Sequence, residues 1–191
     1  ESTNMGFFLK DGGYYFTLNE KADLSFKSNI FTKGSWSLKS QLRYKKRYRY
    51  NGNLNLNFGK NFNSEKGFPD YSEKKDFNIQ WRHQQDSKVN PSIQFSANVE
   101  AGSSSYHRNN SFNANDFLKN TMASSINLTK NWKSAFFNNL SFNLRHSQNT
   151  TTKNVSLTLP DISLNSKRFY PLKTIGDPAK TQWYDKIMIR Y

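Results

Sequence analysis

The sequence predicts an all-β protein, an antiparallel up-and-down meander of roughly eleven strands. Apolar and polar residues alternate with a period of two over most of the chain, as they do when neighbouring residues of a strand face opposite sides of a sheet. Turn-forming residues such as Asn, Gly and Asp separate these runs. No segment holds a helical period over several turns, and the best helical candidate, 116–119, is a single turn inside a polar loop.

The N-terminal part predicts short strands joined by tight turns. Gly6–Leu9 (GFFL) is predicted as a strand that ends in a turn at Lys10–Gly13. The even-numbered residues are then apolar from Tyr14 to Leu18 and again, beyond a turn at Asn19–Lys21, at Ala22, Leu24, Phe26 and Ile30. A further turn is predicted at Lys33–Ser35.

The next strand is predicted from Trp36 to Tyr50 and contains a basic, tyrosine-rich run, RYKKRYRY. Its even positions are mostly apolar or aromatic and its odd positions mostly cationic, so the charges form one side of a strand. The apolar residues stay even from Leu54 to Phe62, which requires a hairpin loop with an odd number of residues. Asn51–Asn53, with a central glycine, is the simplest such loop.

The remaining strands are predicted from shorter alternating runs. The parity of the last long run switches at Pro160-Asp161, which predicts a bulge or a break there. The predicted strands include 77–81, 93–99, 122–128, 140–144, 155–164 and a last strand at 184–191.

Composition excludes several classes of protein. The chain has 28 Lys and Arg against 14 Asp and Glu, a net charge of +14, which predicts attraction to anionic partners. It has no cysteine, and its histidines, His83, His107 and His146, have no metal-binding or catalytic spacing, so we expect no enzyme activity, no metal and no cofactor. Nucleic acid is not expected as a partner, because base stacking would need aromatic residues and cations on the same face.

The two predicted faces favour a transmembrane β-barrel over a sheet packed in a soluble core. One face is polar throughout, as a water-filled barrel lumen allows. The other is apolar with aromatic residues toward its ends, as in the girdles at membrane interfaces. The predicted lipid-facing residues are Trp36, Leu38, Leu42, Leu54, Leu56, Phe58, Ile79, Ile93, Phe95, Val99, Ile126, Leu128, Phe142 and Leu144. The predicted girdle residues are Tyr44, Tyr48, Tyr50, Trp81 and Trp132. A basic ladder is predicted on the lumen face, made of Lys27, Lys39, Arg43, Lys45, Arg47 and Arg49.

Residues 1–191 are predicted to be part of a single barrel domain of the outer membrane, with long loops near 63–75 and 103–120 and short periplasmic turns. An open meander would leave backbone groups unpaired in hydrocarbon, so the chain is expected to be an incomplete segment of a larger barrel. Two alternatives stay open: a small porin-like or adhesin barrel, and a soluble basic β-sheet that acts as a binding module.

The chain resembles the LptD family, which assembles lipopolysaccharide at the outer membrane. The resemblance begins with GFFLKDGGYYFTLNEKADLSFKSNIFTKGSWSLKSQLRY and continues through GFPDYSEKKDFNIQWRHQQD, FSANVEAGSSSYHRNN, SFNLRHSQN and VSLTLPDISLNSKRFYPLK, in the form found in Bacteroidetes-type Gram-negative bacteria.

The resemblance implies transport of lipopolysaccharide through a large barrel with a lateral gate between its first and last strands. It also implies an LptE-like lipoprotein plug, a periplasmic bridge protein that contacts a domain missing here, and outer-membrane lipids as partners. This chain would bear the first-strand side of the gate, at Gly6, Phe7, Phe8, Leu9, Tyr14, Tyr15, Phe16 and Leu18. Glycines stand where relatives have a gate proline, so a proline-based gate is not implied.

Overall fold

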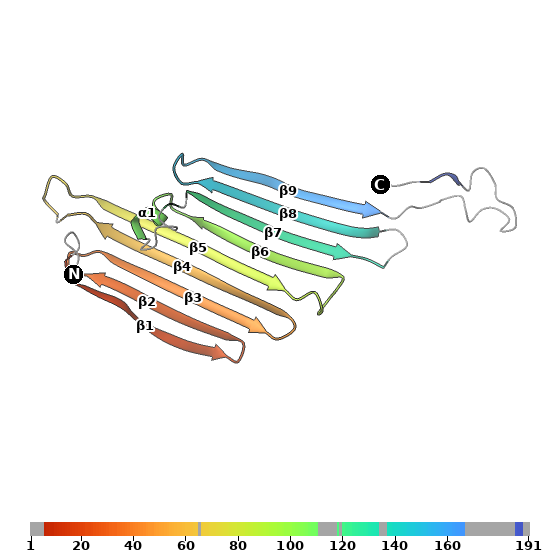
Figure 1. The fold of residues 1–191 in the computed structure, drawn as a ribbon, viewed down its shortest axis with the longest axis horizontal. Helices are drawn as coiled ribbons and strands as arrows, with labels where there is room; N and C mark the ends of the chain where they lie inside the picture. The colour runs from red at the N-terminus through yellow and green to blue at the C-terminus, as the bar shows by residue number, and fades with distance from the viewer. Residues whose placement is uncertain are drawn as a thin grey trace.

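A computed structural model describes residues 6–64, 66–110, 118, 120–133, 137–166 and 186–188. Within them, nine strands form a single antiparallel sheet in which each strand pairs with the next along the chain (Figure 1). The predicted all-β up-and-down meander is confirmed. The described part of the sheet is open, because β1 and β9 each have one paired neighbour. The strands are β1 (Phe8–Asn19), β2 (Ala22–Phe31), β3 (Trp36–Lys46), β4 (Tyr50–Phe62), β5 (Glu73–Gln85), β6 (Ile93–Gly102), β7 (Thr121–Asn131), β8 (Phe137–Asn149) and β9 (Val155–Ser166).

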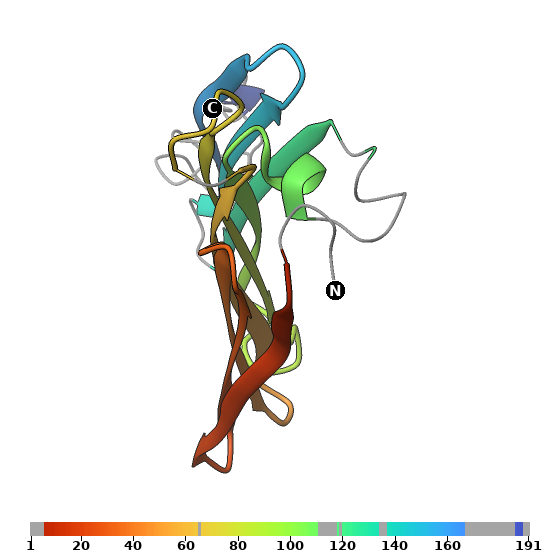
Figure 2. The same cartoon turned by 90° about the vertical axis from the view of Figure 1, so that its left-hand side faces the viewer.

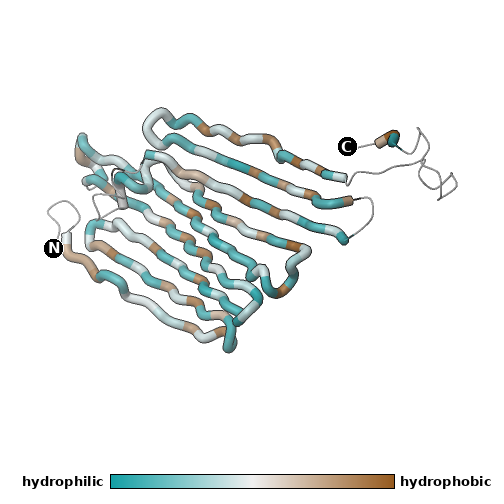
Figure 3. Tube along the Cα trace, turned by 45° about the vertical axis from the view of Figure 1, so that its right-hand side comes forward, coloured by the Kyte–Doolittle hydropathy of each residue, from teal (hydrophilic) through white to brown (hydrophobic). Residues whose placement is uncertain are grey.

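The register brings residues of like character together across the strands. Leu24 pairs with Leu42, which pairs with Leu54, so the apolar residues of neighbouring strands share one face of the sheet. Figure 3 shows the alternation of hydrophobic and hydrophilic residues along the strands. A slip of one residue in any pair would move every apolar side chain to the other face, so this pattern specifies the register.

No second layer packs on the apolar face among the described residues, and the sheet is thin when seen along its edge (Figure 2). Ala97 and Met122 are the buried hydrophobic residues in this part of the chain. Large apolar side chains stay open instead, for example Leu56, which is 42% exposed, and Phe58, which is 54% exposed. Exposed apolar side chains gathered on one face mark a surface that contacts protein or lipid.

The first strand differs from the prediction. Gly6–Leu9 and Tyr14–Leu18 were expected as two strands with a turn at Lys10–Gly13, but β1 runs without a break from Phe8 to Asn19. A bulge between Leu9 and Gly12 takes up the extra residues, with Asp11 at a positive φ of 55°. The Asp11 backbone N–H donates to Asn29 Oδ1 at 2.7 Å, so a side chain of β2 satisfies the backbone of the bulge.

The hairpin between β3 and β4 also differs from the prediction. The loop has three residues, as the parity required, but it is Arg47–Arg49 and not Asn51–Asn53. Tyr48 takes the left-handed conformation, with φ 60°, and Asn51 and Gly52 lie inside β4. A Cβ on Gly52 would lie 2.4 Å from the Tyr44 ring and 2.6 Å from the Arg82 carbonyl oxygen, so this glycine gives room to an aromatic side chain inside the sheet.

The end of the chain agrees with the prediction in part. The expected irregularity at Pro160-Asp161 is confirmed as a register shift within a continuous β9, opposite the segment from Asn143 to Arg145. The predicted strand at 184–191 is wrong for residues 186–188, which are not in a strand, and otherwise falls outside the described residues. The structure has a short helix, α1 (Tyr106–Asn110), that the sequence did not predict. Of the helical candidate at 116–119 the structure describes residue 118, which lies in a turn. None of the helices in the described part of the chain is long and apolar enough to span a membrane.

The connections between strands define two edges of the sheet (Figure 1). The short-turn edge carries the connections 20–21, 47–49, 86–92 and 132–136. The long-loop edge carries the connections 32–35, 63–72, 103–120 and 150–154, of which the two central ones are long. The predicted loops near 63–75 and 103–120 therefore lie at the same edge, although β5 already begins at Glu73.

Candidate functional site

The apolar face carries all the residues that the sequence predicted to contact lipid. The register joins Trp81 to Leu54 and Val99, and Ile126 to Leu144, so these side chains lie on one side of the sheet from β3 to β8. The complete set on this face is Trp36, Leu38, Leu42, Leu54, Leu56, Phe58, Ile79, Ile93, Phe95, Val99, Ile126, Leu128, Phe142 and Leu144. Their contact with lipid stays a prediction.

Three of the predicted girdle residues form a cluster at the short-turn end of this face. Trp81 Nε1 donates to Tyr44 Oη at 2.9 Å, and the same oxygen lies 2.9 Å from His83 Nδ1. The Tyr50 ring stacks on His83, with centroids 6.0 Å apart, and Phe95 lies 5.3 Å from it on the other side. An imidazole that contacts several aromatic rings and has one ring nitrogen hydrogen-bonded to a phenol suits the interface between the hydrocarbon of a membrane and water.

His83 was not among the predicted girdle residues, although its odd position in the run Phe77, Ile79, Trp81 placed it on the same face. The other two girdle residues lie apart from the cluster. Tyr48 is in the β3–β4 turn with the Arg47 guanidinium 4.8 Å above its ring, and Trp132 carries Lys130 Nζ at 5.1 Å.

The opposite face, called the polar face below, holds only part of the predicted basic ladder. Lys27 lies directly opposite Lys39, and Arg43 and Lys45 follow on β3. Arg47 and Arg49 were expected on the same strand, but they are in the turn, because β3 ends at Lys46. The ladder is therefore shorter than predicted.

Arg43 is the ladder residue with a carboxylate partner. Its Nε and Nη2 donate to Asp23 Oδ2 at 2.9 and 2.7 Å across the β2–β3 pair. The side chain is 58% exposed, so solvent screens this ion pair. The contact fixes the direction of the guanidinium more than it stabilises the sheet.

The polar face is hollowed near the short-turn edge. A depression of about 940 Å³ is lined by residues of β1 to β6 and by the β1–β2 turn. Its charged lining residues are Glu20, Lys21, Asp23, Arg43, Lys45 and Arg82. The cations exceed the carboxylates, so this hollow favours anionic groups.

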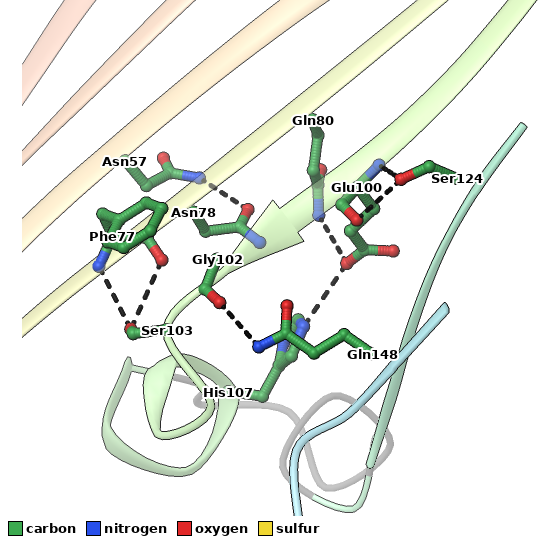
Figure 4. A network of polar contacts seen from close by, with 10 residues as sticks. All are labelled: Asn57, Phe77, Asn78, Gln80, Glu100, Gly102, Ser103, His107, Ser124 and Gln148. Carbon is green, nitrogen blue, oxygen red and sulfur yellow. Dashed lines mark hydrogen bonds and ion pairs between the residues drawn. The ribbon is translucent and has the colours of Figure 1, made fainter. Parts of the chain in front are cut away.

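A second site on the polar face lies toward the long-loop edge, where the segment 103–110 folds onto the sheet (Figures 2 and 4). Asp76 is 1% exposed and accepts hydrogen bonds from the hydroxyls of Ser103 and Ser105. His107 of α1 is 5% exposed, and its Nε2 lies 3.3 Å from Glu100 Oε1.

Further polar contacts connect the strands around this segment (Figure 4). Gln80 Nε2 donates to Glu100 Oε1 at 3.2 Å, and Gln148 Nε2 of β8 donates to the Gly102 carbonyl oxygen at 3.0 Å. Asn78, fully buried, accepts from Asn57 at 3.4 Å. These residues, with Asp76, Ser103, Ser105 and His107, are called the latch. No group of His, Asp and Glu in the described ranges could hold a metal ion.

The predicted gate residues all lie at the β1 edge of the sheet. Leu9 and Tyr14 are 65% and 76% exposed, and β2 covers one side of the strand only. Gly13 is required there, because a Cβ would lie 1.9 Å from the Phe26 carbonyl oxygen. The residues predicted for the gate are Gly6 and Phe7, just before β1, and Phe8, Leu9, Tyr14, Tyr15, Phe16 and Leu18 within it, and their role in a gate stays a prediction.

The chain matches the model of one protein family, described as "LptD protein", over residues 1–191. A search of curated proteins gives no match.

Proposed function

The chain belongs to the LptD family, and from this premise we propose that it forms part of the wall of an outer-membrane β-barrel that inserts lipopolysaccharide into the outer leaflet. Membership suggests lipopolysaccharide transport and assembly at the outer membrane, which is a transport function and not an enzymatic one. The proposal adds the role of this segment and the sides on which lipid and glycolipid lie.

One observation carries the proposal: a nine-stranded sheet with an exposed apolar face, an opposite face of polar residues and no covering layer on the apolar side among the described residues. In a bilayer, acyl chains would cover the apolar face, and the polar face would line an aqueous lumen. The cluster around Tyr44 and Trp81 would lie at the periplasmic interface, where the short turns of such barrels are found. The outer edges of β1 and β9 would pair with further strands, since hydrocarbon does not tolerate open sheet edges.

The β1 edge would bear the first-strand side of the lateral gate. Two features support this proposal: a bulge at Asp11, which interrupts regular pairing, and glycines at positions 12 and 13, which weaken a strand. The basic residues of the polar face, Lys27, Lys39, Arg43 and Lys45, would meet the anionic part of the glycolipid or an LptE-like plug in the lumen. A periplasmic bridge protein would deliver the glycolipid.

Spin labels test the assignment of the faces. The chain has no cysteine, so single substitutions Leu56→Cys and Asn57→Cys can be labelled in the full-length protein, after replacement of any cysteine outside this chain, and reconstituted in liposomes. We expect the label at Leu56 to collide with oxygen dissolved in the bilayer and the label at Asn57 to collide with a water-soluble nickel complex. A label at Leu56 that neither reagent reaches would mean that protein covers this face, and the barrel proposal would be wrong.

A photo-cross-linker tests the gate. Placed at Tyr14 in the full-length protein in cells, it should form an adduct with lipopolysaccharide, whereas the same group at Leu56, in the middle of the apolar face, should react with ordinary membrane lipids. Equal yields of lipopolysaccharide adduct at the two positions would remove the gate from β1 and leave the barrel assignment intact.

A further inference from the structure

Three arginines of the polar face lie in one row across the sheet. Arg43 pairs with Asn53, and Asn53 pairs with Arg82. Arg82 pairs with Asn98, Asn98 with Ser125, and Ser125 with Arg145. These residues, Arg43, Asn53, Arg82, Asn98, Ser125 and Arg145, are called the arginine row. The sequence alone did not indicate it, because Arg82 and Arg145 are isolated cations far apart in the chain.

The arginine row is exposed to solvent and carries more positive than negative charge. All three arginines are exposed, and the positions between them are amides or a hydroxyl, which donate hydrogen bonds without adding charge. Arg43 has Asp23 as its partner, whereas Arg82 and Arg145 form no ion pair with other described residues. Two guanidinium groups are therefore available to bind an anion.

The row begins near the short-turn edge of the sheet and ends nearer the long-loop edge. Arg43 lies close to the end of β3 at the short-turn edge, whereas Arg145 lies past the middle of β8 on the way to the long-loop edge. Strands of a barrel are tilted, so a row perpendicular to them rises along the barrel axis. Strands lie about 4.8 Å apart, which places Arg82 on the order of 10 Å from Arg43 and roughly 14 Å from Arg145.

The spacing between the arginines suits an anionic ligand that moves along the row. Guanidinium groups bind phosphate with two parallel hydrogen bonds, and single cations separated by uncharged donors give several weak sites in place of one tight site. Passage along a pore requires sites of this kind, because a ligand must leave each of them. The hollow at the short-turn edge contains Arg43 and Arg82 and gives room for a bulky headgroup at the start of the row.

We propose that the arginine row is a track for the phosphate groups of the transported glycolipid, which pass from Arg43 to Arg82 and then to Arg145 as the headgroup moves from the periplasmic toward the external end of the lumen. This inference rests on the proposed function and adds the residues, the ligand group and the direction. It differs from a ladder along β3, because the track follows the register across strands.

Cross-linking at Asn98, between Arg82 and Arg145, tests the track in the full-length protein with its partners in cells. We expect a glycolipid adduct in the unmodified protein and a yield at least about fivefold lower in the double variant Arg82→Gln/Arg145→Gln, since charge-assisted hydrogen bonds to phosphate are lost. The matched control is Arg47→Gln/Arg49→Gln, which removes the same charge from the β3–β4 turn and should leave the yield unchanged. Arg82→Lys/Arg145→Lys should retain an intermediate yield.

The phosphate is tested with purified proteoliposomes that contain either phosphorylated or dephosphorylated lipopolysaccharide. The dephosphorylated glycolipid should react with the unmodified protein as weakly as the phosphorylated one reacts with Arg82→Gln/Arg145→Gln. Equal yields from all variants, an equal loss in the turn variant, or an adduct with a protein at Asn98 would each overturn the track.

Folding and function are controlled separately. All variants should keep the heat-dependent electrophoretic mobility of the folded barrel, and Arg82→Gln alone provides a milder variant should the double change disturb assembly. If depletion of the full-length protein leaves lipopolysaccharide at the cell surface unchanged, the proposed function fails. If depletion removes it but Arg82→Gln/Arg145→Gln delivers it normally, the function stands and the arginine row is wrong.

Discussion

Both ends of the polar face carry ionisable side chains, but these side chains are exposed at one end and buried at the other. Near the short-turn edge, Arg43 and Arg82 line an open hollow and are exposed. Toward the long-loop edge, Asp76 and His107 are almost completely buried in the latch. The difference comes from the segment 103–110, which covers the second region and leaves the first uncovered (Figure 2).

The comparison shows that a polar face can be partly a packed interior. Buried polar groups are tolerated when most of them are hydrogen-bonded, and contacts from β5, β6, β8 and the segment itself supply such partners in the latch, although the buried Asn78 Nδ2 has none among the described residues. The hollow needs no such partners, because solvent reaches its cations. The latch is therefore expected to be sensitive to substitution and the hollow tolerant, apart from its role toward a ligand.

The largest effect is expected in the latch, from Asp76→Ala. The change leaves the hydroxyls of Ser103 and Ser105 without their shared carboxylate, at a cost of about 2 to 4 kcal/mol in the local stability of segment 103–110. Hydrogen exchange in the folded full-length barrel measures this directly. The control is Asp161→Ala, an exposed aspartate on β9, which should leave exchange unchanged. Equal protection of the segment in both variants would mean that Asp76 does not hold it.

A smaller effect is expected from Gly102→Ala at the end of β6. The new Cβ would lie 2.5 Å from the Phe77 carbonyl oxygen, so β5 must shift, at a cost of about 1 to 3 kcal/mol. The temperature at which the barrel loses its heat-dependent mobility should fall. In the control Gly12→Ala the Cβ meets atoms no closer than 3.6 Å, and the temperature should hardly change. A fall of the same size in both would point to strand propensity and not to close packing as the cause.

The smallest effect on stability is expected in the hollow, from Arg43→Gln. Its ion pair with Asp23 is exposed and screened by solvent, so the melting temperature of the barrel should stay the same within error. Binding should respond instead: the variant should release phosphorylated lipopolysaccharide at a lower salt concentration than the unmodified protein does. A marked loss of thermal stability would show that the ion pair holds the β2–β3 hairpin, and the contrast between the two regions would lose its basis.

Sequence periodicity was sufficient to predict on which face of the sheet a residue lies, but not at which residue a strand ends. Leu54, Leu56 and Phe58 lie on the predicted side because a period of two admits no other arrangement in a strand. The turn was placed at Asn51–Asn53 because Asn-Gly is a strong local signal, but Gly52 is needed beside the Tyr44 ring, and Tyr48 takes the left-handed position. A tertiary contact thus outweighed a local preference. The same holds at Gly12 and Gly13, which allow a bulge and a close approach in β1 and not a turn.

Residue patterns along the chain were enough to predict the all-β class, the antiparallel order, the side on which each strand residue lies and the bulge at Pro160, because each depends on neighbours along the chain. The residues that meet across strands could not be predicted in this way: the arginine row, the cluster of Tyr44, Trp81 and His83, and the latch under α1 are seen in the folded chain. Alternation along a strand excludes a register slip of one residue but is equally compatible with a slip of two, and it does not determine the path of a connecting segment. Contacts between residues far apart in the chain decide both.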